Sequence, residues 1–221
     1  MHFEFLVEDV SGEIVLKSLV EKILGVNGAE HSYTFHKYKG VGHIPKNMTA
    51  TSDIRSQMLL NNLPRLLRGY GKSLQYSPAV VVVVVDADRR DCVEFKNELR
   101  ALLNACNPAP TTLFRIAVEE MEAWLLGARS AITAAYPRAK TNILNRYRQD
   151  SICGTWELLA DAIHKGGAAA LKKEGWPAPG RAKCEWAKKI APHVDVDTNQ
   201  SPSFKVFRDG IRSLAQETTT P

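Results

Sequence analysis

The stretch VVVVVVDAD, Val80 to Asp88, decides the fold of this chain. Its six valines are too few to cross a membrane, which takes about 20 apolar residues. Their β-branched side chains favour a strand over a helix. Because the strand is apolar on both faces, it is typical of a parallel sheet that helices cover on both sides. Ligands in such sheets bind just beyond the carboxyl ends of the strands, so Asp86 and Asp88 mark the expected position of a functional site.

The first half of the chain alternates between strand and helix patterns. Strands are expected at 3–7, 32–38 and 112–118 in addition to the valine strand, and an amphipathic helix follows each of them. Pro64 is expected to bend or split the second helix, which Asp53 would cap and which Gly69 and Gly71 would end. The alternation predicts an α/β fold with a mostly parallel four-stranded sheet flanked by helices.

The strand pattern stops near residue 128. Helical patterns continue at 130–136, 140–147, 156–165, 168–174, 181–191 and 204–214, with proline-containing loops between several of them. The sequence therefore predicts an α/β domain at 1–127, a helical C-terminal subdomain at 128–216 packed on the sheet, and a frayed tail at 217–221.

The composition and charge of the chain bound its environment. A net charge of +5 and a pI of about 9.0 favour an acidic partner such as nucleic acid, although charge alone identifies none. The four cysteines have no CxxC spacing and are typical of reduced thiols. Neither a leader peptide nor a membrane-spanning stretch is recognisable. We therefore expect a cytoplasmic protein with no membrane partner.

Carboxylates follow three of the four expected strands: Glu8 and Asp9, then Asp86 and Asp88, then Glu119 and Glu120. Parallel strands end at one edge of a sheet, so these groups are expected to converge there. Clustered carboxylates repel one another, and a hard cation such as Mg²⁺ or Mn²⁺ would relieve the repulsion. Such ions promote phosphodiester cleavage. The alternative is that the acids cap the helices that follow them.

The acid after the first strand and the Asp-x-Asp after the third resemble the Toprim domain of topoisomerases, primases and nucleases. The matching segments are Val7-Glu8-Asp9 and Asp86-Ala87-Asp88. Toprim proteins usually have glycine where this chain has Asp9, which leaves open an additional ligand or a changed activity. Three later segments resemble the Toprim-like family DUF4276, and the likeness covers most of the chain: VEEMEAWLL at 118–126, WAKKIA at 186–191 and SPSF at 201–204.

The resemblance implies a Toprim-like, metal-dependent nuclease or nuclease-like subunit. Glu8 would be the Toprim glutamate, a metal ligand or general base, and Asp86 and Asp88 would hold Mg²⁺. Members of the family resemble anti-phage defence proteins encoded beside an ABC-type ATPase, so an AAA- or ABC-type ATPase is the expected protein partner, and the chain could form an oligomer. A non-catalytic Toprim-like subunit is the alternative, and a phosphotransferase or phosphatase acting on small molecules is a third interpretation.

Several cations lie beside the predicted acids. Lys37, Lys39 and His43 follow the second strand, and Arg89 and Arg90 follow the Asp-x-Asp, so these five side chains could contact nucleic-acid phosphates. A solvated basic loop is the alternative for the first three.

Lys183 is a further candidate, a cation for the negative charge that develops during phosphoryl transfer.

Two other sequence features are not expected to take part in function. Gly71-Lys72-Ser73 lacks the upstream glycine and the preceding strand of a phosphate-binding P-loop. Trp124, Trp156 and Trp176 are expected in the core rather than stacked on bases.

Overall fold

The computed structural model describes residues 1–45, 57–151 and 154–217. Its centre is a sheet of four parallel strands in the order β2-β1-β3-β4. The strands are β1 (His2–Val7), β2 (Ser32–Lys37), β3 (Ala79–Asp86) and β4 (Thr112–Ala117). The predicted α/β fold with a parallel sheet is therefore confirmed.

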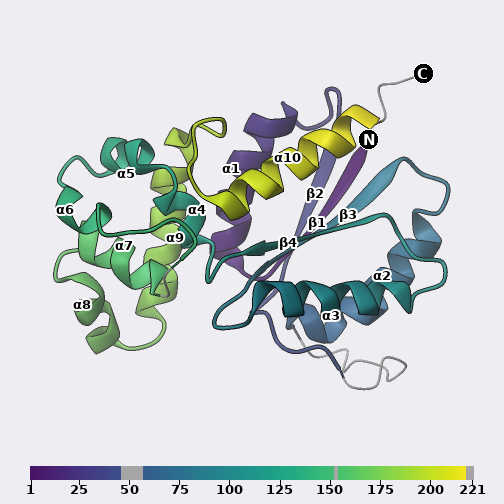
Figure 1. The fold of residues 1–221 in the computed structure, drawn as a ribbon, viewed down its shortest axis with the longest axis horizontal. Helices are drawn as coiled ribbons and strands as arrows, with labels where there is room; N and C mark the ends of the chain where they lie inside the picture. Colours follow the sequence, from purple (N-terminus) through teal and green to yellow (C-terminus); the bar gives the residue numbers. More distant parts are fainter. Residues whose placement is uncertain (46–56, 152–153, 218–221) are drawn as a thin grey trace.

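Helices cover both faces of this sheet (Figure 1). On one face lie α1 (Val10–Leu24) and α10 (Pro202–Glu217), and on the other lie α2 (Leu59–Ser73) and α3 (Cys92–Asn104). The valine strand explains this arrangement. Val80, Val82 and Val84 belong to the core beneath α1, while alternate valines of the same strand belong to the core beneath α2 and α3. A strand buried on both sides has to be apolar at every position.

The remaining helices lie beyond one end of the sheet, on the left of Figure 1. They are α4 (Glu122–Leu126), α5 (Arg129–Ala135), α6 (Thr141–Leu144), α7 (Thr155–Ile163), α8 (Gly167–Glu174), α9 (Ala178–Ile190) and the 3-10 helix η1 (Ala191–His193). The predicted helical C-terminal region is therefore present. Its core is continuous with the core beneath α1, and the division of the chain at residue 128 stays a prediction.

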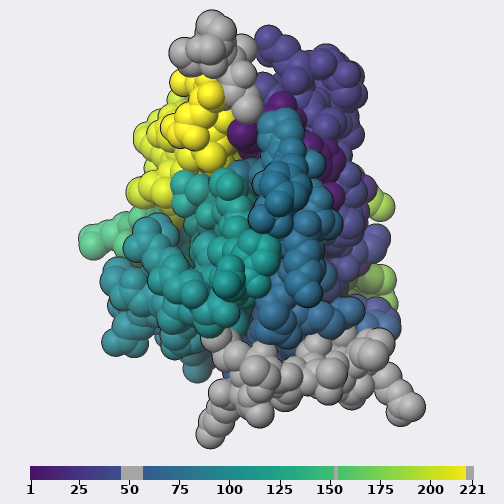
Figure 2. Space-filling view, turned by 90° about the vertical axis from the view of Figure 1, so that its right-hand side faces the viewer, coloured from purple at the N-terminus to yellow at the C-terminus, as the bar shows by residue number. Residues whose placement is uncertain are grey.

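The C-terminal helix closes one face of the molecule. The space-filling view shows α10, in yellow, packed against elements from the middle of the chain (Figure 2). The Arg115 side chain of β4 fixes this contact, because its Nε donates a hydrogen bond to Val206 O at 3.1 Å. None of the described helices is both long enough and apolar enough to cross a bilayer.

The second helix is not split at Pro64 and does not end at the glycines predicted to end it. Pro64 lies inside α2, which remains one helix and continues past Gly69 and Gly71 to Ser73. Gly71 serves packing instead, because a Cβ at this position would lie 1.9 Å from the Pro108 carbonyl oxygen. The predicted cap, Asp53, lies outside the described residues.

The three predicted core tryptophans have different environments. Trp124 is fully buried between Phe204 and Phe207, as predicted. Trp176 is 86% exposed, so the prediction that it lies in the core is wrong. It occupies the short loop between α8 and α9, where no neighbouring element covers it, and the apolar pattern of the sequence did not reveal this.

Candidate functional site

The candidate site lies where the first and third strands end side by side. Val7 of β1 is in register with Val84 of β3, and the chain leaves these strands toward opposite edges of the sheet. Such a reversal is the point where open α/β sheets bind ligands. Glu8 follows β1, and its Oε2 accepts a hydrogen bond from the Asp86 N–H at 3.2 Å. The sheet therefore joins two acids that are 78 residues apart in the chain.

The loops that follow β3 and β4 are joined to each other. The Asp88 N–H donates to Glu119 O at 2.8 Å, and the Ala87 N–H donates to Ala117 O at 3.0 Å. Asp88 and Glu119 both have positive φ angles, 50° and 65°. This conformation costs a non-glycine residue free energy and clusters at functional sites. The loops thus place the exposed Asp88 next to the backbone of Glu119.

A buried lysine reaches the acids from the helical region. Lys183 of α9 lies with its Nζ 3.0 Å from Glu120 Oε1 and 3.2 Å from Glu122 Oε2. All three side chains are largely buried, and Glu122 is only 3% exposed. The positive charge of Lys183 also acts on Glu8 and Asp86. Lys183 therefore lies beside the acids, and its predicted role as a catalytic cation stays a prediction.

The acids carry more negative charge than this lysine balances. Burial, together with the charges of Asp88 and Asp9, raises the pKa of Glu8 to about 7, although the Asp86 N–H and Lys183 oppose the shift. Burial and the charge of Glu8 raise the pKa of Asp86 well above its ordinary value.

The same excess of negative charge is found after β4, where Glu120 lies. Burial and the neighbouring Glu122 raise the pKa of Glu120 to about 7, against the opposing charge of Lys183. Protons therefore remain on part of this cluster near neutral pH, and a bound cation would replace them.

Some of the predicted metal ligands have structural partners. Asp9 caps α1, because its Oδ1 accepts the Gly12 N–H at 2.7 Å and its Oδ2 accepts the Ser11 hydroxyl at 2.8 Å. Glu119 accepts the N–H groups of Gly154 and Thr155 at the start of α7, the latter at 2.7 Å. The alternative that the acids cap the helices that follow them therefore describes Asp9. Glu119 instead binds the start of α7, which lies further along the chain than α4, the helix that follows it.

Asp86 and Asp88 do not cap the helix that follows them. That role belongs to Asp91, whose Oδ1 accepts the N–H groups of Val93 and Glu94 at 2.8 and 2.9 Å. The Asp-x-Asp pair therefore remains available for another purpose.

The acids have the oxygen ligands that a hard divalent ion requires, but their side chains are not grouped around one position. Glu8, Asp86 and Asp88 would supply the oxygen ligands that Mg²⁺ and Mn²⁺ prefer. Across residues 1–45, 57–151 and 154–217, however, no group of three or more His, Cys, Asp or Glu side chains is placed to hold one ion. The metal role of Glu8, Asp86, Asp88, Asp9, Glu119 and Glu120 stays a prediction, and Glu8, Asp86 and Asp88 are the residues that would hold the ion.

A cleft of about 670 Å³ opens beside the acids. Asp88 and Glu120 line it, together with Arg89 and Trp156. Lys172 lies over the Trp156 ring, with Nζ 5.4 Å from the ring centroid. The cleft combines acids, a cation and an aromatic ring, which suits a substrate that carries both a phosphate and a planar base.

The predicted phosphate-binding cations are placed differently from one another. Arg89 lines the cleft. Arg90 also lines it, but it stacks on Phe95 at 3.7 Å from the ring centroid and pairs with Glu98 at 2.5 Å.

The cations at the end of β2 and after it are not among the residues that line this cleft. Lys37 pairs with Glu13 at 3.1 Å, and Lys39 lines a second pocket. His43 is exposed, and its N–H donates to Asn61 Oδ1 at 3.0 Å.

Sequence reasoning missed the roles of two residues of the site. Trp156 was expected in the core, and it does pack against the core, but it is only half-buried and also lines the cleft. Thr155 is fully buried, and it bonds Glu119 through its N–H and Glu120 through its hydroxyl, the latter at 3.3 Å. No local pattern marks either residue, because both reach the site only through the packing of α7. Glu122 lies outside the predicted set of metal ligands, although it is the most deeply buried acid beside Lys183.

These features define an α/β protein whose parallel sheet ends in an acid cluster with one buried lysine. The chain belongs to the family described as domain of unknown function DUF4276, whose sequence profile matches residues 7–212. No curated protein and no solved structure matches the chain.

Proposed function

We propose that this protein is a Toprim-like, metal-dependent nuclease or nuclease-like subunit that acts on nucleic-acid phosphodiesters. The observation that carries the proposal is the partly buried Glu8–Asp86 pair, with raised pKa values, at the strand ends beside Lys183. Buried acids with perturbed pKa values next to a cleft are typical of catalytic sites.

Each residue has a role in this proposal. Asp86 and Asp88 would hold Mg²⁺ or Mn²⁺, and the ion, when bound, supplies Lewis-acid stabilisation of the reacting phosphate. Glu8 accepts a proton from the attacking water or hydroxyl, because the ion beside it favours the charged form of its carboxylate. Lys183 offsets negative charge that builds up during the reaction. Arg89 in the cleft contacts the substrate phosphates.

The proposed partners follow from the family resemblance and from the chemistry of the site. Nucleic acid is the substrate, an AAA- or ABC-type ATPase is the protein partner, and anti-phage defence in the cytoplasm is the setting. The positive net charge of +5 supports a polyanionic substrate.

A cleavage assay tests the activity. The purified protein is incubated with supercoiled plasmid DNA and with single-stranded RNA, in Mn²⁺ or Mg²⁺, and with the ATPase encoded beside it where there is one. Glu8→Gln and Asp86→Asn are each expected to lower the cleavage rate by about a hundredfold or more. Glu30→Gln, which changes an exposed acid away from the site, serves as the control. Undiminished cleavage by both site variants with unchanged circular dichroism would remove the proposal.

One observation favours a second candidate, a non-catalytic interaction subunit. Asp9 and Glu119 direct their carboxylate oxygens to helix termini, which leaves fewer ligands for an ion. Calorimetric titration with Mn²⁺ separates the two candidates. A nuclease binds the ion, with weaker binding in Asp86→Asn, whereas an interaction subunit gives no binding heat in either protein.

A further inference from the structure

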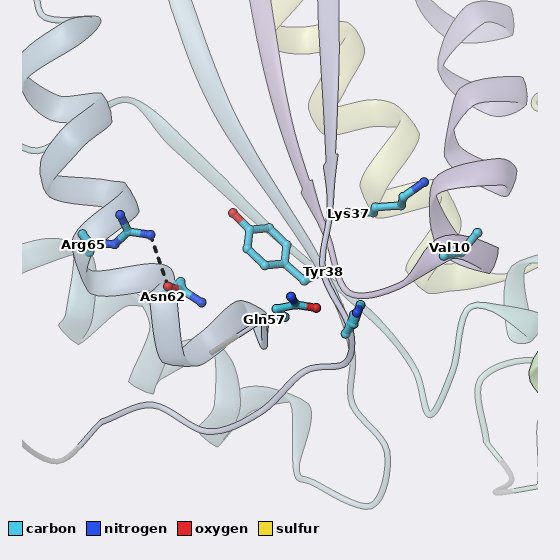
Figure 3. Close-up of a pocket in the computed structure, with 7 residues that line it drawn as sticks. Val10, Lys37, Tyr38, Gln57, Asn62 and Arg65 are labelled. Atoms are coloured by element: carbon cyan, nitrogen blue, oxygen red, sulfur yellow. Dashed lines mark hydrogen bonds between the residues drawn. The ribbon is translucent and has the colours of Figure 1, made fainter. Parts of the chain in front are cut away.

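A second pocket, of about 330 Å³, lies between α2 and the segment that follows β2, whereas the cleft described above lies beside the ends of β3 and β4 (Figure 3). Its polar lining consists of Lys37, Tyr38, Lys39, Gln57, Asn62 and Arg65. The segment after β2 forms one wall and is fastened to the end of β1. The Tyr38 N–H donates to Val7 O at 3.0 Å, and the Gly40 N–H donates to Glu8 O at 2.9 Å. The pocket is therefore a neighbour of the acid cluster, with a separate set of side chains.

The lining of this pocket is rich in donors and positive charge. Arg65 donates to Asn62 Oδ1 at 3.3 Å, and no aspartate or glutamate is among the described residues that line the pocket. Lys39 adds a second charge at this wall. A guanidinium without a carboxylate in its own pocket retains most of its five N–H donors for a ligand.

Two further details define what can bind. In Figure 3 the Tyr38 hydroxyl points toward Arg65, whereas Lys37 points away from them toward α1. Lys37 is committed to its ion pair with Glu13 at 3.1 Å. Burial raises the pKa of Tyr38, against the opposing charge of Arg65, so the hydroxyl keeps the proton that it would donate. The pocket thus presents Arg65 and the Tyr38 hydroxyl to a ligand that only accepts hydrogen bonds, and Lys39 elsewhere in the lining adds positive charge.

We propose that this pocket binds a phosphate monoester, held by Arg65 and the Tyr38 hydroxyl, with Lys39 adding positive charge to the lining. The phosphate belongs either to a free nucleotide or to the 5′ end of a nucleic-acid strand whose body passes the acid cluster. The assignment to a nucleic-acid 5′ end rests on the proposed nuclease function, whereas the proposal that the pocket binds phosphate does not.

Inorganic phosphate is the first probe, titrated into the full chain by calorimetry in EDTA. Because a charged hydrogen bond contributes about 1.5–3 kcal/mol, Arg65→Gln is expected to weaken phosphate binding by about tenfold or more. Lys39→Gln and Tyr38→Phe are expected to weaken it by smaller factors. Lys72→Gln, which removes one exposed charge from the same helix, is the matched control. No phosphate binding by the unaltered protein, or equal losses in Arg65→Gln and Lys72→Gln, would overturn the proposal.

A second measurement identifies the source of the phosphate. Binding of a labelled oligonucleotide with a 5′-phosphate is compared with binding of the same strand ending in a 5′-hydroxyl. A preference for the phosphorylated strand that Arg65→Gln abolishes assigns the pocket to a strand end. Binding of adenosine 5′-monophosphate without such a preference assigns it to a free nucleotide. In both cases Glu8→Gln is expected to bind phosphate normally, so a chain that binds phosphate but cleaves nothing contradicts only the nuclease proposal.

Discussion

Glu8 and Asp86 share a hydrogen bond and a buried environment, and the free energy of this pair depends on protonation. The pKa of Glu8 rises from its ordinary 4.5 to about 7 in the folded chain because burial disfavours the charged form. The protonated acid therefore favours the folded state. Its stabilising contribution is complete below pH 4.5 and is lost as the pH rises through about 7.

Unfolding free energies measured by denaturant titration in EDTA test this residue. Between pH 4.5 and about 7, Glu8 is expected to lower the stability of the unaltered protein by up to about 3 kcal/mol relative to Glu8→Gln. Added Mg²⁺ or Mn²⁺ should reduce the difference, because an ion bound to Glu8 favours its charged form. Parallel pH profiles for the two proteins would show that Glu8 titrates normally.

Some single residues could be chosen from the sequence and others could not. The valine run showed that Asp86 lies at the end of a strand. Because parallel strands end at one edge of a sheet, Glu8, at the end of the first strand, was expected close to Asp86. The ion pair of Lys37 with Glu13 and the stacking of Arg90 on Phe95 depend on how separate elements pack. A sequence pattern shows which residues come directly after a strand, but it does not show which side chains from distant segments lie within reach of them.

The helices of the C-terminal region are attached to the sheet by specific polar contacts. Lys22, near the end of α1, donates to Ala191 O, Pro192 O and Val194 O at 3.1, 2.6 and 2.7 Å. These carbonyls lie in η1 and directly after it, beyond the end of α9, and Ala191 O also accepts the Val194 N–H at 3.2 Å. One lysine therefore joins the first helix of the chain to the helix that carries Lys183.

Replacing this lysine measures the strength of the joint. Lys22→Met keeps the apolar part of the side chain and removes three charged donors, so it is expected to lower the free energy of unfolding by about 2–3 kcal/mol. Lys173→Met, an exposed position on α8, is the control and should change stability by less than about 0.5 kcal/mol. Equal melting temperatures for the two variants would contradict the proposed joint.

The SPSF segment, one of the three segments that resemble the family, has a structural role at the start of α10. The Ser201 hydroxyl accepts the Phe204 N–H at 3.2 Å and so caps α10, and it donates to Asp150 Oδ1 at 2.9 Å. The Ser203 hydroxyl accepts the Trp124 Nε1–H at 2.9 Å. The motif thus fixes where α10 begins. This role could not be predicted from the sequence, because the hydrogen-bond partners of the two serines lie about 50 and 80 residues away in the chain.

At the scale of the whole molecule, the two predicted domains share one core. Leu16 and Leu19 of α1 belong to the same buried cluster as Trp186 of α9 and Phe207 of α10. The composition change near residue 128 revealed where strands stop, and it could not reveal that the helices beyond complete the covering of the sheet.

A chain cut after Gly127 tests whether the first part folds alone. Without α9 and α10, the apolar face of α1 would be exposed to water, so the fragment is expected not to unfold cooperatively and to bind a hydrophobic dye. Circular dichroism during urea titration, with the full chain as the reference, provides the measurement. A sharp unfolding transition for the fragment would establish residues 1–127 as an independent domain.

The position of Lys183 on α9 has a consequence for how the protein is made. During synthesis the acids at positions 8 to 122 leave the ribosome well before the lysine that offsets their charge. A nascent chain therefore carries an incomplete cluster until α9 has been translated and has docked. The cluster is therefore complete only after most of the chain has been synthesised and α9 has packed against α1.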